Sequence, residues 1–217
     1  MRGISKAFLP VVVAAALLAA GCGADTATKS QAAARPAKPQ CPAAWQAGWQ
    51  QLANRIQAPV FCPAWMPAPL TGQITGKVSF GGAGGYTLSV SKDRSYLASF
   101  IWAEPQSGEI HVNLRGYPGR TAIPRCVEEN YNNGKLLKKP VPCFADPRGV
   151  VRERGIVATV YTANQDADLW HILYAWRYRG SLYTISEHVA EPLTYQKVVA
   201  NLHRILRNLV PVEPARG

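Results

Sequence analysis

Acidic residues, cysteines and long apolar runs are all scarce in this chain. Its 13 Asp and Glu stand against 24 Lys and Arg, which gives a formal net charge of +11. Beyond residue 21 no run of eighteen apolar residues occurs, so we expect no transmembrane helix in that part. The GxSxG and HExxH signatures of serine hydrolases and zinc peptidases are absent, and the glycine-rich stretch 81–85 lacks the Gly-Lys-Ser/Thr of a phosphate-binding loop.

Metal-binding patterns are missing as well. No CxxC pair occurs, and the four histidines are scattered along the sequence, which argues against zinc. The segment 164–168 (NQDAD) places oxygen ligands at alternate positions, but it lacks the glycine and the distal glutamate of a helix-loop-helix calcium site. We therefore expect no metal and no other cofactor. The histidines are His111, His171, His188 and His203.

The first 22 residues have the order of a secretory signal peptide. Arg2 and Lys6 provide positive charge, and residues 8–20 form an apolar run of thirteen residues, too short to span a bilayer as a mature helix. Two small residues then precede Cys22. This order predicts export and removal of residues 1–21; an ordinary secreted protein cut nearby is the alternative.

A cysteine placed directly after small residues resembles the lipobox of bacterial lipoprotein precursors. In such precursors the thiol receives a diacylglyceryl group, and the small neighbours let the signal peptidase reach the backbone. The match departs from the family pattern at Ala19, where Leu is the commoner residue. The resemblance implies that a lipidated Cys22, carrying palmitate, anchors the mature chain at the outer face of the cell membrane.

Residues 22–40 are expected to comprise the lipidated cysteine and a disordered tether. They consist mostly of small and polar residues with almost no large apolar side chain. As a flexible coil the tether would average roughly 20–25 Å from end to end. Residues 41–217 are numerous enough to form a single extracytoplasmic domain with its own core.

Four cysteines remain after Cys22, an even number that predicts two disulfides in an oxidising compartment. Three pairings are possible. The sequential pairing closes two loops of similar length, each of which would stabilise the fold by about 3 kcal/mol, but the sequence leaves the pairing open. The four residues are Cys41, Cys62, Cys126 and Cys143.

Two amphipathic helices are predicted, at 43–57 and at 195–209. Pro59 ends the first helix, and Thr194 is the expected N-cap of the second. Each helix carries its large apolar residues on one stripe, so each should pack on another layer of structure. The stripe of the first helix contains Trp45, Trp49, Leu52 and Ile56.

The remaining segments alternate between strands and turns. Residues 59–72 predict a proline-rich linker, 81–85 a hairpin tip, and 116–154 an irregular region with one hairpin turn at 132–134 (NNG). Together these elements predict an α+β domain, an antiparallel, curved sheet of about six to seven strands with the N-terminal and C-terminal helices packed on it. The expected strands are 73–80, 86–91, 95–103, 109–115, 155–162, 168–178 and 181–188.

The densest basic segment lies at 135–154. Together with the positive net charge it predicts attraction to anionic lipid or wall polymer, and a solvated loop is the alternative. Nucleic acid is not an expected partner of an exported, anchored protein. The candidate anion-binding residues are Lys135, Lys138, Lys139, Arg148 and Arg152.

Three other features bear on function. Glu109 and His111 alternate along one predicted strand, so their side chains share a face and could form the acid–base pair of an envelope hydrolase. His171 is expected to be a hydrogen-bonded, half-buried residue. A pocket between the sheet and the helix at 195–209 would suit a lipid or another apolar ligand.

Two stretches are similar to known groups of proteins. CPAAWQAGWQQLANRIQ at 41–57 and FCPAWMPAPL at 61–70 resemble uncharacterised lipoproteins of high-GC Gram-positive bacteria. LYAWRYRGSLYTISEHV at 173–189 is similar to small exported domains of unknown function. Neither group carries a catalytic set, so the resemblance transfers no functional residue beyond Cys22.

The leading hypothesis is therefore a membrane-anchored, non-catalytic binding or accessory module of the cell envelope. One form of it carries a lipid or another apolar ligand. The alternatives are an envelope hydrolase that uses Glu109 and His111, and a structural lipoprotein that docks a partner through residues 135–154. The oligomeric state stays open.

Overall fold

A computed structural model of the chain describes residues 38–74, 83–104, 108–163 and 170–215. Within them seven strands form one antiparallel sheet in the order β2-β3-β4-β10-β9-β8-β7. Two runs of consecutive hairpins therefore meet where β4 pairs with β10 in the middle of the sheet. The strands are β2 (Ala83–Val90), β3 (Tyr96–Glu104), β4 (Gly108–Tyr117), β7 (Ala145–Glu153), β8 (Ile156–Ala163), β9 (His171–Tyr178) and β10 (Ser181–His188).

Helix α1 (Ala43–Ile56) forms where the 3.6-residue periodicity predicts it. Pro42 occupies its N-cap, and Gln57 adopts the left-handed conformation at its C-cap, two residues before Pro59. The apolar stripe is buried as expected, and it places two tryptophans in the core. Its buried residues are Trp45, Trp49, Leu52, Ala53 and Ile56.

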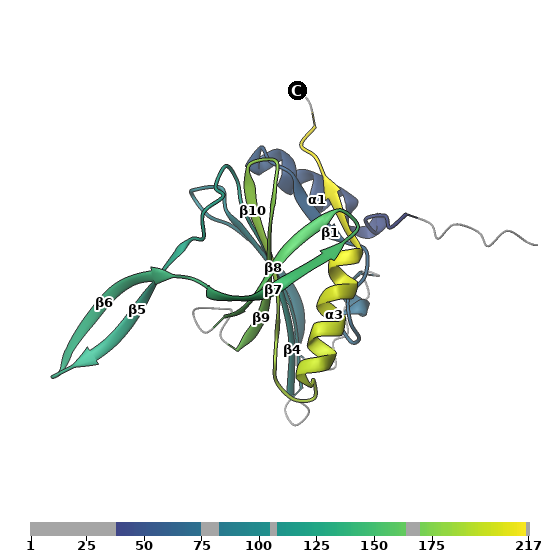
Figure 1. Cartoon of the computed structure of the whole chain (residues 1–217). Helices are drawn as coiled ribbons and strands as arrows, with labels where there is room; N and C mark the ends of the chain where they lie inside the picture. The colour runs from purple at the N-terminus through teal and green to yellow at the C-terminus, as the bar shows by residue number, and fades with distance from the viewer. Residues whose placement is uncertain (1–37, 75–82, 105–107, 164–169, 216–217) are drawn as a thin grey trace, which may run out of the picture. The chain divides into compact units, whose positions relative to one another are not determined.

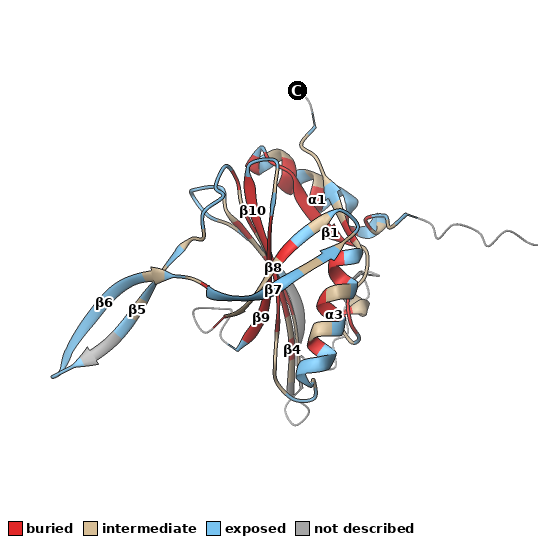
Figure 2. Ribbon diagram, in the orientation of Figure 1, coloured by how far each residue is buried: buried red, intermediate tan, exposed pale blue. Residues whose placement is uncertain are grey.

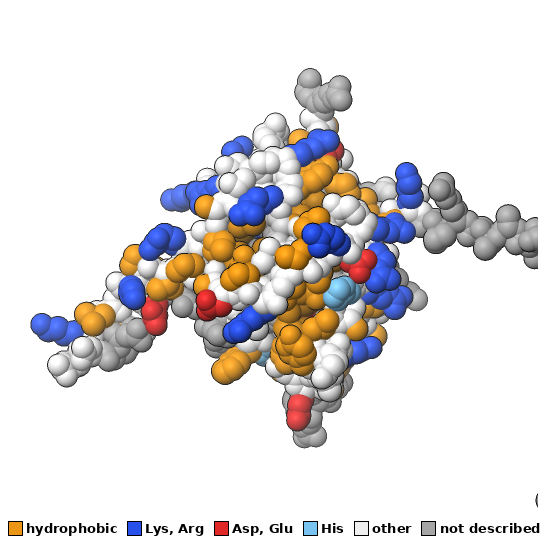
Figure 3. All heavy atoms as spheres, viewed as in Figure 1, with side chains coloured by type: hydrophobic (Ala, Val, Ile, Leu, Met, Phe, Trp, Pro, Cys, Tyr) orange, Lys and Arg blue, Asp and Glu red, His pale blue; other side chains and the backbone are white. Residues whose placement is uncertain are grey.

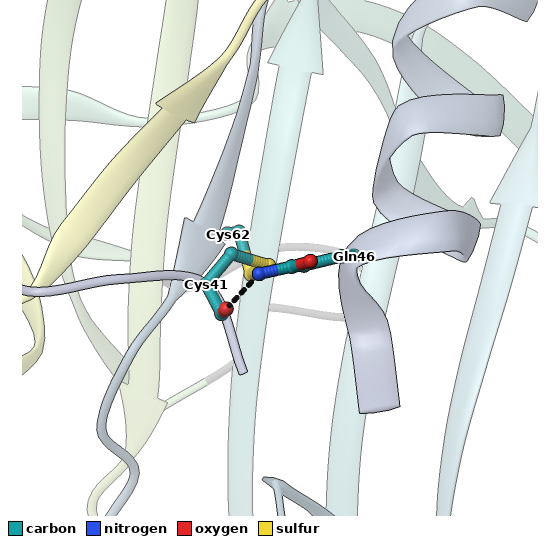
Figure 4. The surroundings of a disulfide bond; sticks show 3 residues. All are labelled: Cys41, Gln46 and Cys62. Atoms are coloured by element: carbon teal, nitrogen blue, oxygen red, sulfur yellow. Dashed lines mark hydrogen bonds between the residues drawn. A yellow bond between two sulfur atoms is a disulfide. The ribbon is translucent and has the colours of Figure 1, made fainter. Parts of the chain in front are cut away.

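A small second sheet holds the two helices together. Strand β1 (Val60–Pro63) pairs antiparallel with β11 (Leu209–Val212), and every residue of β1 is buried. The Cys41–Cys62 disulfide ties the start of α1 to β1, and the Gln46 amide donates to the Cys41 carbonyl at 3.1 Å (Figure 4). The prediction of a proline-rich linker at 59–72 is thus partly wrong. Strand β1 is buried on both faces, so its sequence shows no alternation that would indicate a strand.

Helix α3 (Tyr195–Arg207) covers one face of the seven-stranded sheet (Figure 1). The Thr194 hydroxyl caps it by accepting from the Lys197 backbone N–H at 3.3 Å, as the sequence predicts. Its sheet-facing side is buried and its outer side is exposed (Figure 2). The main hydrophobic core joins α1, α3 and this face of the sheet. The α3 side chains at the centre of the contact are Val198, Leu202, Ile205 and Leu206.

The other face of the sheet carries a smaller apolar cluster beside a group of buried polar side chains. The cluster consists of Phe144, Ala163, Leu173, Ala175 and Leu182. The buried polar residues on this face are Ser99, Asn113, His171, Thr184 and Ser186. Buried polar groups are costly unless they are hydrogen-bonded, so this face holds the most informative residues of the fold.

Strands β5 (Arg125–Asn132) and β6 (Lys135–Pro142) form a two-stranded arm that projects away from the side of the sheet that carries α3 (Figure 1). Among the described strands these two pair only with each other. The turn at Asn133-Gly134, both at positive φ, is the predicted hairpin turn. The Cys126–Cys143 disulfide closes the base of the arm. The prediction of an irregular region at 116–154 is therefore wrong, because most of these residues belong to paired strands.

The α+β fold, the antiparallel sheet, its two helices and both disulfides agree with the expectation, and the cysteine pairing is sequential. Residues 83–85 begin β2 and are not a hairpin tip. The strand expected at 73–80 is wrong at residues 73–74, which end the short helix α2 (Thr71–Ile74), and the rest of it lies outside the described residues. The signal peptide at 1–21, Cys22, most of the tether and the segment 164–168 also lie outside them. In the described part of the chain no helix is long and apolar enough to cross a membrane.

Candidate metal centre

Three histidines from three neighbouring strands converge on the sheet face opposite the helices. His188 on β10 pairs directly with His171 on β9, and the β4–β10 register places His111 on its other side. Residues directly opposite each other in an antiparallel pair point to the same face. The three imidazoles are therefore neighbours, and one ligand nitrogen from each lies within 4.8 Å of the others.

The rings pack at distances that leave no room for another side chain between them. The ring centroids of His111 and His171 are 4.8 Å apart at nearly a right angle, and those of His171 and His188 are 5.2 Å apart and stacked. The third pair, His111 and His188, is separated by 6.4 Å. His171 is buried, and the other two rings are partly buried.

Hydrogen-bonding groups surround the cluster and orient two of its rings. His111 Nδ1 lies 3.2 Å from Glu109 Oε1, and His111 Nε2 lies 2.9 Å from Asn113 Oδ1 and 3.2 Å from Ser99 Oγ. His171 Nδ1 lies 2.9 Å from Ser186 Oγ, so His171 is hydrogen-bonded as expected, but it is buried and not half-buried. A carboxylate, a hydroxyl or an amide beside a ligating imidazole fixes the orientation of its ring.

The pair expected from the sequence, Glu109 and His111, does meet. The two residues are two apart on β4 and share a face, which brings the carboxylate onto the imidazole. The Glu109 side chain is 43% exposed and that of His111 is 15% exposed, so the pair lies at the rim of the cluster, where solvent reaches it. This position suits a carboxylate that orients a ligand or receives a proton.

His188 differs from the other two histidines because its Nδ1 is buried and has no hydrogen-bond partner among the described residues. Burial lowers the pKa of His188; the Glu109 carboxylate opposes this shift and His111 adds to it. The ring therefore tends to be neutral, with a nitrogen lone pair free to bind a cation. An unpartnered buried nitrogen within a group of imidazoles is what a metal ion would satisfy.

The donor set matches a transition metal in number and type. Zinc bound by imidazole has Zn–N distances of about 2.0–2.1 Å, which places the ligand nitrogens of a tetrahedral site about 3.3–3.5 Å apart. Nitrogens within 4.8 Å of one another lie near that spacing, and the stacked rings of His171 and His188 would have to turn for both lone pairs to point at one ion. Coordination through His111 Nε2 would require this nitrogen to give up its contacts with Asn113 Oδ1 and Ser99 Oγ, and it would leave Nδ1–H donating to Glu109, as in a carboxylate–histidine–zinc arrangement.

The expectation that the histidines are scattered fails for three of the four. They are far apart in sequence, and only the pairing of β10 between β4 and β9 unites them. One signal was present: only two residues separate the expected strands 168–178 and 181–188, and a tight turn there places His171 and His188 opposite each other in a symmetric hairpin. His203 lies elsewhere on α3, where its Nδ1 is 3.2 Å from Glu153 Oε1.

The basic residues expected to bind anions do not share one structural element. Lys135, Lys138 and Lys139 are on β6 of the arm, whereas Arg148 and Arg152 are on β7 of the large sheet. Lys138 Nζ forms an ion pair with Glu129 Oε1 at 2.6 Å. The arm and the edge strand β7 are therefore two separate basic regions.

Among the described residues, the helix-covered face holds one carboxyl group in its core. Glu187 is completely buried beneath α3, and its Oε1 accepts from Asn201 Nδ2 at 2.8 Å. Burial raises the pKa of Glu187 to about 8, against the opposing effects of Asn201 and Lys197. Glu187 and His188 are adjacent in sequence and point to opposite faces of β10, so this carboxyl is not part of the histidine cluster.

Surface hollows flank α1. One of about 550 Å³ lies between α1 and β2, where Leu52, Leu88 and Val90 contribute to its lining, and another of about 580 Å³ lies between α1 and β11. The apolar stripe of α3, by contrast, is buried against the sheet, with Leu202 fully covered. An apolar ligand would therefore find its space beside α1.

Comparison with known proteins gives no match from which a function could be inferred, so the function has to be argued from the residues of this chain. The histidine cluster, its neighbouring carboxylate and the projecting arm are the features that need an explanation. No family model, no curated protein and no solved structure matches the chain.

Proposed function

We propose that this protein is a lipid-anchored extracytoplasmic module that binds a first-row transition metal ion, zinc foremost, through His111, His171 and His188. The observation that supports it best is the convergence of three imidazoles around the buried, unpartnered Nδ1 of His188. Imidazole nitrogens suit zinc, copper, nickel and iron. Three of them leave a fourth position open for water or for a ligand that is exchanged.

The absence of thiol ligands from this site fits a protein outside the cytoplasm. Both cysteine pairs in the described chain are disulfides, which form and persist in an oxidising compartment. A histidine site keeps its ligands there, whereas a thiolate site is open to oxidation. These disulfides, together with the charged, apolar and small residues before Cys22, support the outer face of the cell membrane as the location.

Calorimetric titration of the full chain with Zn²⁺ tests the metal site, and Co²⁺ titration followed by visible absorption reports its geometry. We expect one ion per chain. His171→Asn and His188→Asn should weaken binding by more than about 100-fold, and Glu109→Gln by about 10–100-fold. Affinity should fall as the pH falls, because protons compete with the metal for the imidazoles.

His203→Asn is the matched control, since it removes the one described histidine outside the cluster. It should leave Zn²⁺ affinity unchanged. Circular dichroism of each metal-free variant establishes that the fold is retained. Equal loss of binding in His203→Asn and His188→Asn, or no saturable binding by the parent chain, would show that the cluster is not a metal site.

A second candidate function is metal-assisted hydrolysis, and the 3.2 Å contact between Glu109 and His111 favours it. A zinc ion would supply a water with a pKa near 7, and a carboxylate at the rim could take its proton. Zinc-loaded protein should then hydrolyse an activated ester, and Glu109→Gln at saturating zinc should lose that activity. An inactive parent chain that still binds zinc would leave binding as the function.

A further inference from the structure

We propose that the tip of the β5–β6 arm docks onto an anionic lipid bilayer. The inference goes beyond metal binding and shares with the proposed function only the lipid anchor. It follows from three observations on the arm: exposed apolar side chains, lysines beside them, and projection from the rest of the domain.

Apolar side chains are exposed on both faces of the arm. Leu136 is 39% exposed, Leu137 is 50% exposed, and Val127 on the facing strand is 58% exposed. Successive residues of a strand point to opposite faces, so Leu136 and Leu137 make both sides of the arm apolar just beyond the turn. Burying them in the acyl boundary of a bilayer would remove this surface from water.

The charges of the arm complement an anionic surface where the arm is outermost. Residues 130–137, from the last residues of β5 to Leu137, include Lys135 and no carboxylate. Lys138 and Lys139 follow directly and lie opposite the acids of the arm, Glu129 and Glu128, and Lys138 forms an ion pair with Glu129. Lys135, opposite Asn132, is therefore the lysine with no carboxylate across from it, and a lysine near an anionic leaflet contributes roughly 1 kcal/mol to binding.

Protection of open strand edges explains only part of this pattern. β5 and β6 leave their outer edges unpaired among the described strands, and lysines on such edges discourage pairing with other chains. Exposed leucines have the opposite effect, because they favour association. A surface that receives both leucine and lysine, such as a lipid interface, accounts for the two together; Figure 3 shows apolar and basic side chains following each other along the arm.

The arm is built to reach such a surface. The Cys126–Cys143 disulfide fixes its base, and eight paired positions from Arg125 to Asn132 extend it.

Vesicle sedimentation tests the proposal on the full chain carrying Cys22→Ser, which removes the lipid. We expect binding to phosphatidylcholine vesicles that contain phosphatidylglycerol, weaker binding to phosphatidylcholine alone, and a decrease with added salt. The double variant Leu136→Ser, Leu137→Ser should bind at least about tenfold more weakly. The triple variant K135Q, K138Q, K139Q should lose most of the salt dependence.

A matched control uses one basic and one apolar side chain outside both basic regions, Lys92 in the turn after β2 and the exposed Val157 on β8. The variant K92Q, V157S should bind vesicles like the parent. Equal loss in this control, unchanged binding of both arm variants, or no vesicle binding at all would overturn the proposal. Lysine-dependent, leucine-independent binding to a soluble polyanion would also overturn it in favour of a wall polymer.

The vesicle assay is independent of the metal assay. The arm variants should bind Zn²⁺ like the parent, and His188→Asn should bind vesicles like the parent, because the two sites share no residue. Failure of one proposal is therefore visible without failure of the other. Circular dichroism and intact disulfides in each arm variant show that the fold is kept.

Discussion

The two faces of the seven-stranded sheet are built from the same strands but from different chemistry. On β4 the residues that face the helices are Ile110, Val112 and Leu114, while His111 and Asn113 alternate with them on the other face. β10 repeats the contrast, with Ile185 beneath α3 and Ser186 and His188 opposite. One face is a hydrophobic core, and the other is a buried polar site.

The difference between the two faces separates residues that stabilise the fold from residues that are available for function. Burial of apolar side chains stabilises a fold, whereas burial of imidazoles and amides costs free energy unless each polar atom is satisfied. The helix-covered face contains one exception, the buried Glu187 with its Asn201 partner. Residues on the polar face are therefore expected to be replaceable without loss of the fold, unlike those beneath α1 and α3.

The largest effect is expected beneath α3. Leu202→Ala removes a fully buried side chain from the centre of the core and leaves a cavity, which should lower the free energy of unfolding by about 2–5 kcal/mol. Urea denaturation measures the change. Tyr195→Ala, at an exposed position of the same helix, is the control and should change stability by less than about 0.5 kcal/mol.

A smaller loss of stability is expected from a substitution at Gly116 on β4. A Cβ at Gly116 would collide with the ring of Tyr96, which is buried on the neighbouring strand and has little room to move. Gly116→Ala should therefore destabilise the helix-covered face by about 1–3 kcal/mol, measured by thermal unfolding. Gly48→Ala is the comparison, because a Cβ there meets nothing within 4 Å. Equal destabilisation by both changes would contradict this reading of the packing.

The opposite sign is expected on the polar face. His188→Leu removes a buried nitrogen that has no partner among the described residues, so the metal-free variant should be about 1 kcal/mol more stable than the metal-free parent. Zinc should raise the melting temperature of the parent and leave that of the variant unchanged. A metal-free variant that is clearly less stable would mean that His188 supports the fold and does not serve a ligand.

The smallest effect is expected at the edge of the helix-covered face. Glu153 on β7 accepts from Arg207 at 3.0 and 3.2 Å and contacts His203, and these contacts, Arg207 first, lower the pKa of Glu153. A carboxyl whose pKa is lower in the folded state stabilises the fold above its ordinary value of 4.5 and loses this contribution as the pH falls below it.

Glu153→Gln should therefore reduce stability by about 0.5 kcal/mol at neutral pH, a small amount because Arg207 is largely exposed. As the pH falls below 4.5, the difference between the parent and the variant should shrink. Urea denaturation at several pH values measures the difference. A constant difference across the whole pH range would show that the ionised carboxylate is not what holds α3 to β7.

Local patterns were sufficient for the elements that bury one face. The stripe of α1, the Thr194 cap of α3 and the hairpin turn at Asn133-Gly134 follow from spacing and turn chemistry alone. The same patterns failed for β1, buried throughout, and for the strands of the arm, where alternation is weak. Such segments become strands because of their partners and not because of their own periodicity.

The candidate site divides in the same way. Alternation along β4 was enough to place Glu109 beside His111, since both are on one strand. No local pattern joins His111 to His171 and His188, because the pairing of β4 with β10 links two distant parts of the chain. The pairing forms only when the strands β2–β4 and the strands β7–β10 come together beneath α1 and α3.

The sequence by itself determined which residues are apolar on each strand and helix, how many disulfides are available and where charge accumulates, because these depend on residue type and short-range spacing. Only the tertiary structure decided which cysteines pair, that the basic segment divides between an arm and a sheet edge, and that three distant histidines meet. Periodicity sets the face to which a side chain points, whereas its neighbours across the sheet depend on the order in which the strands assemble.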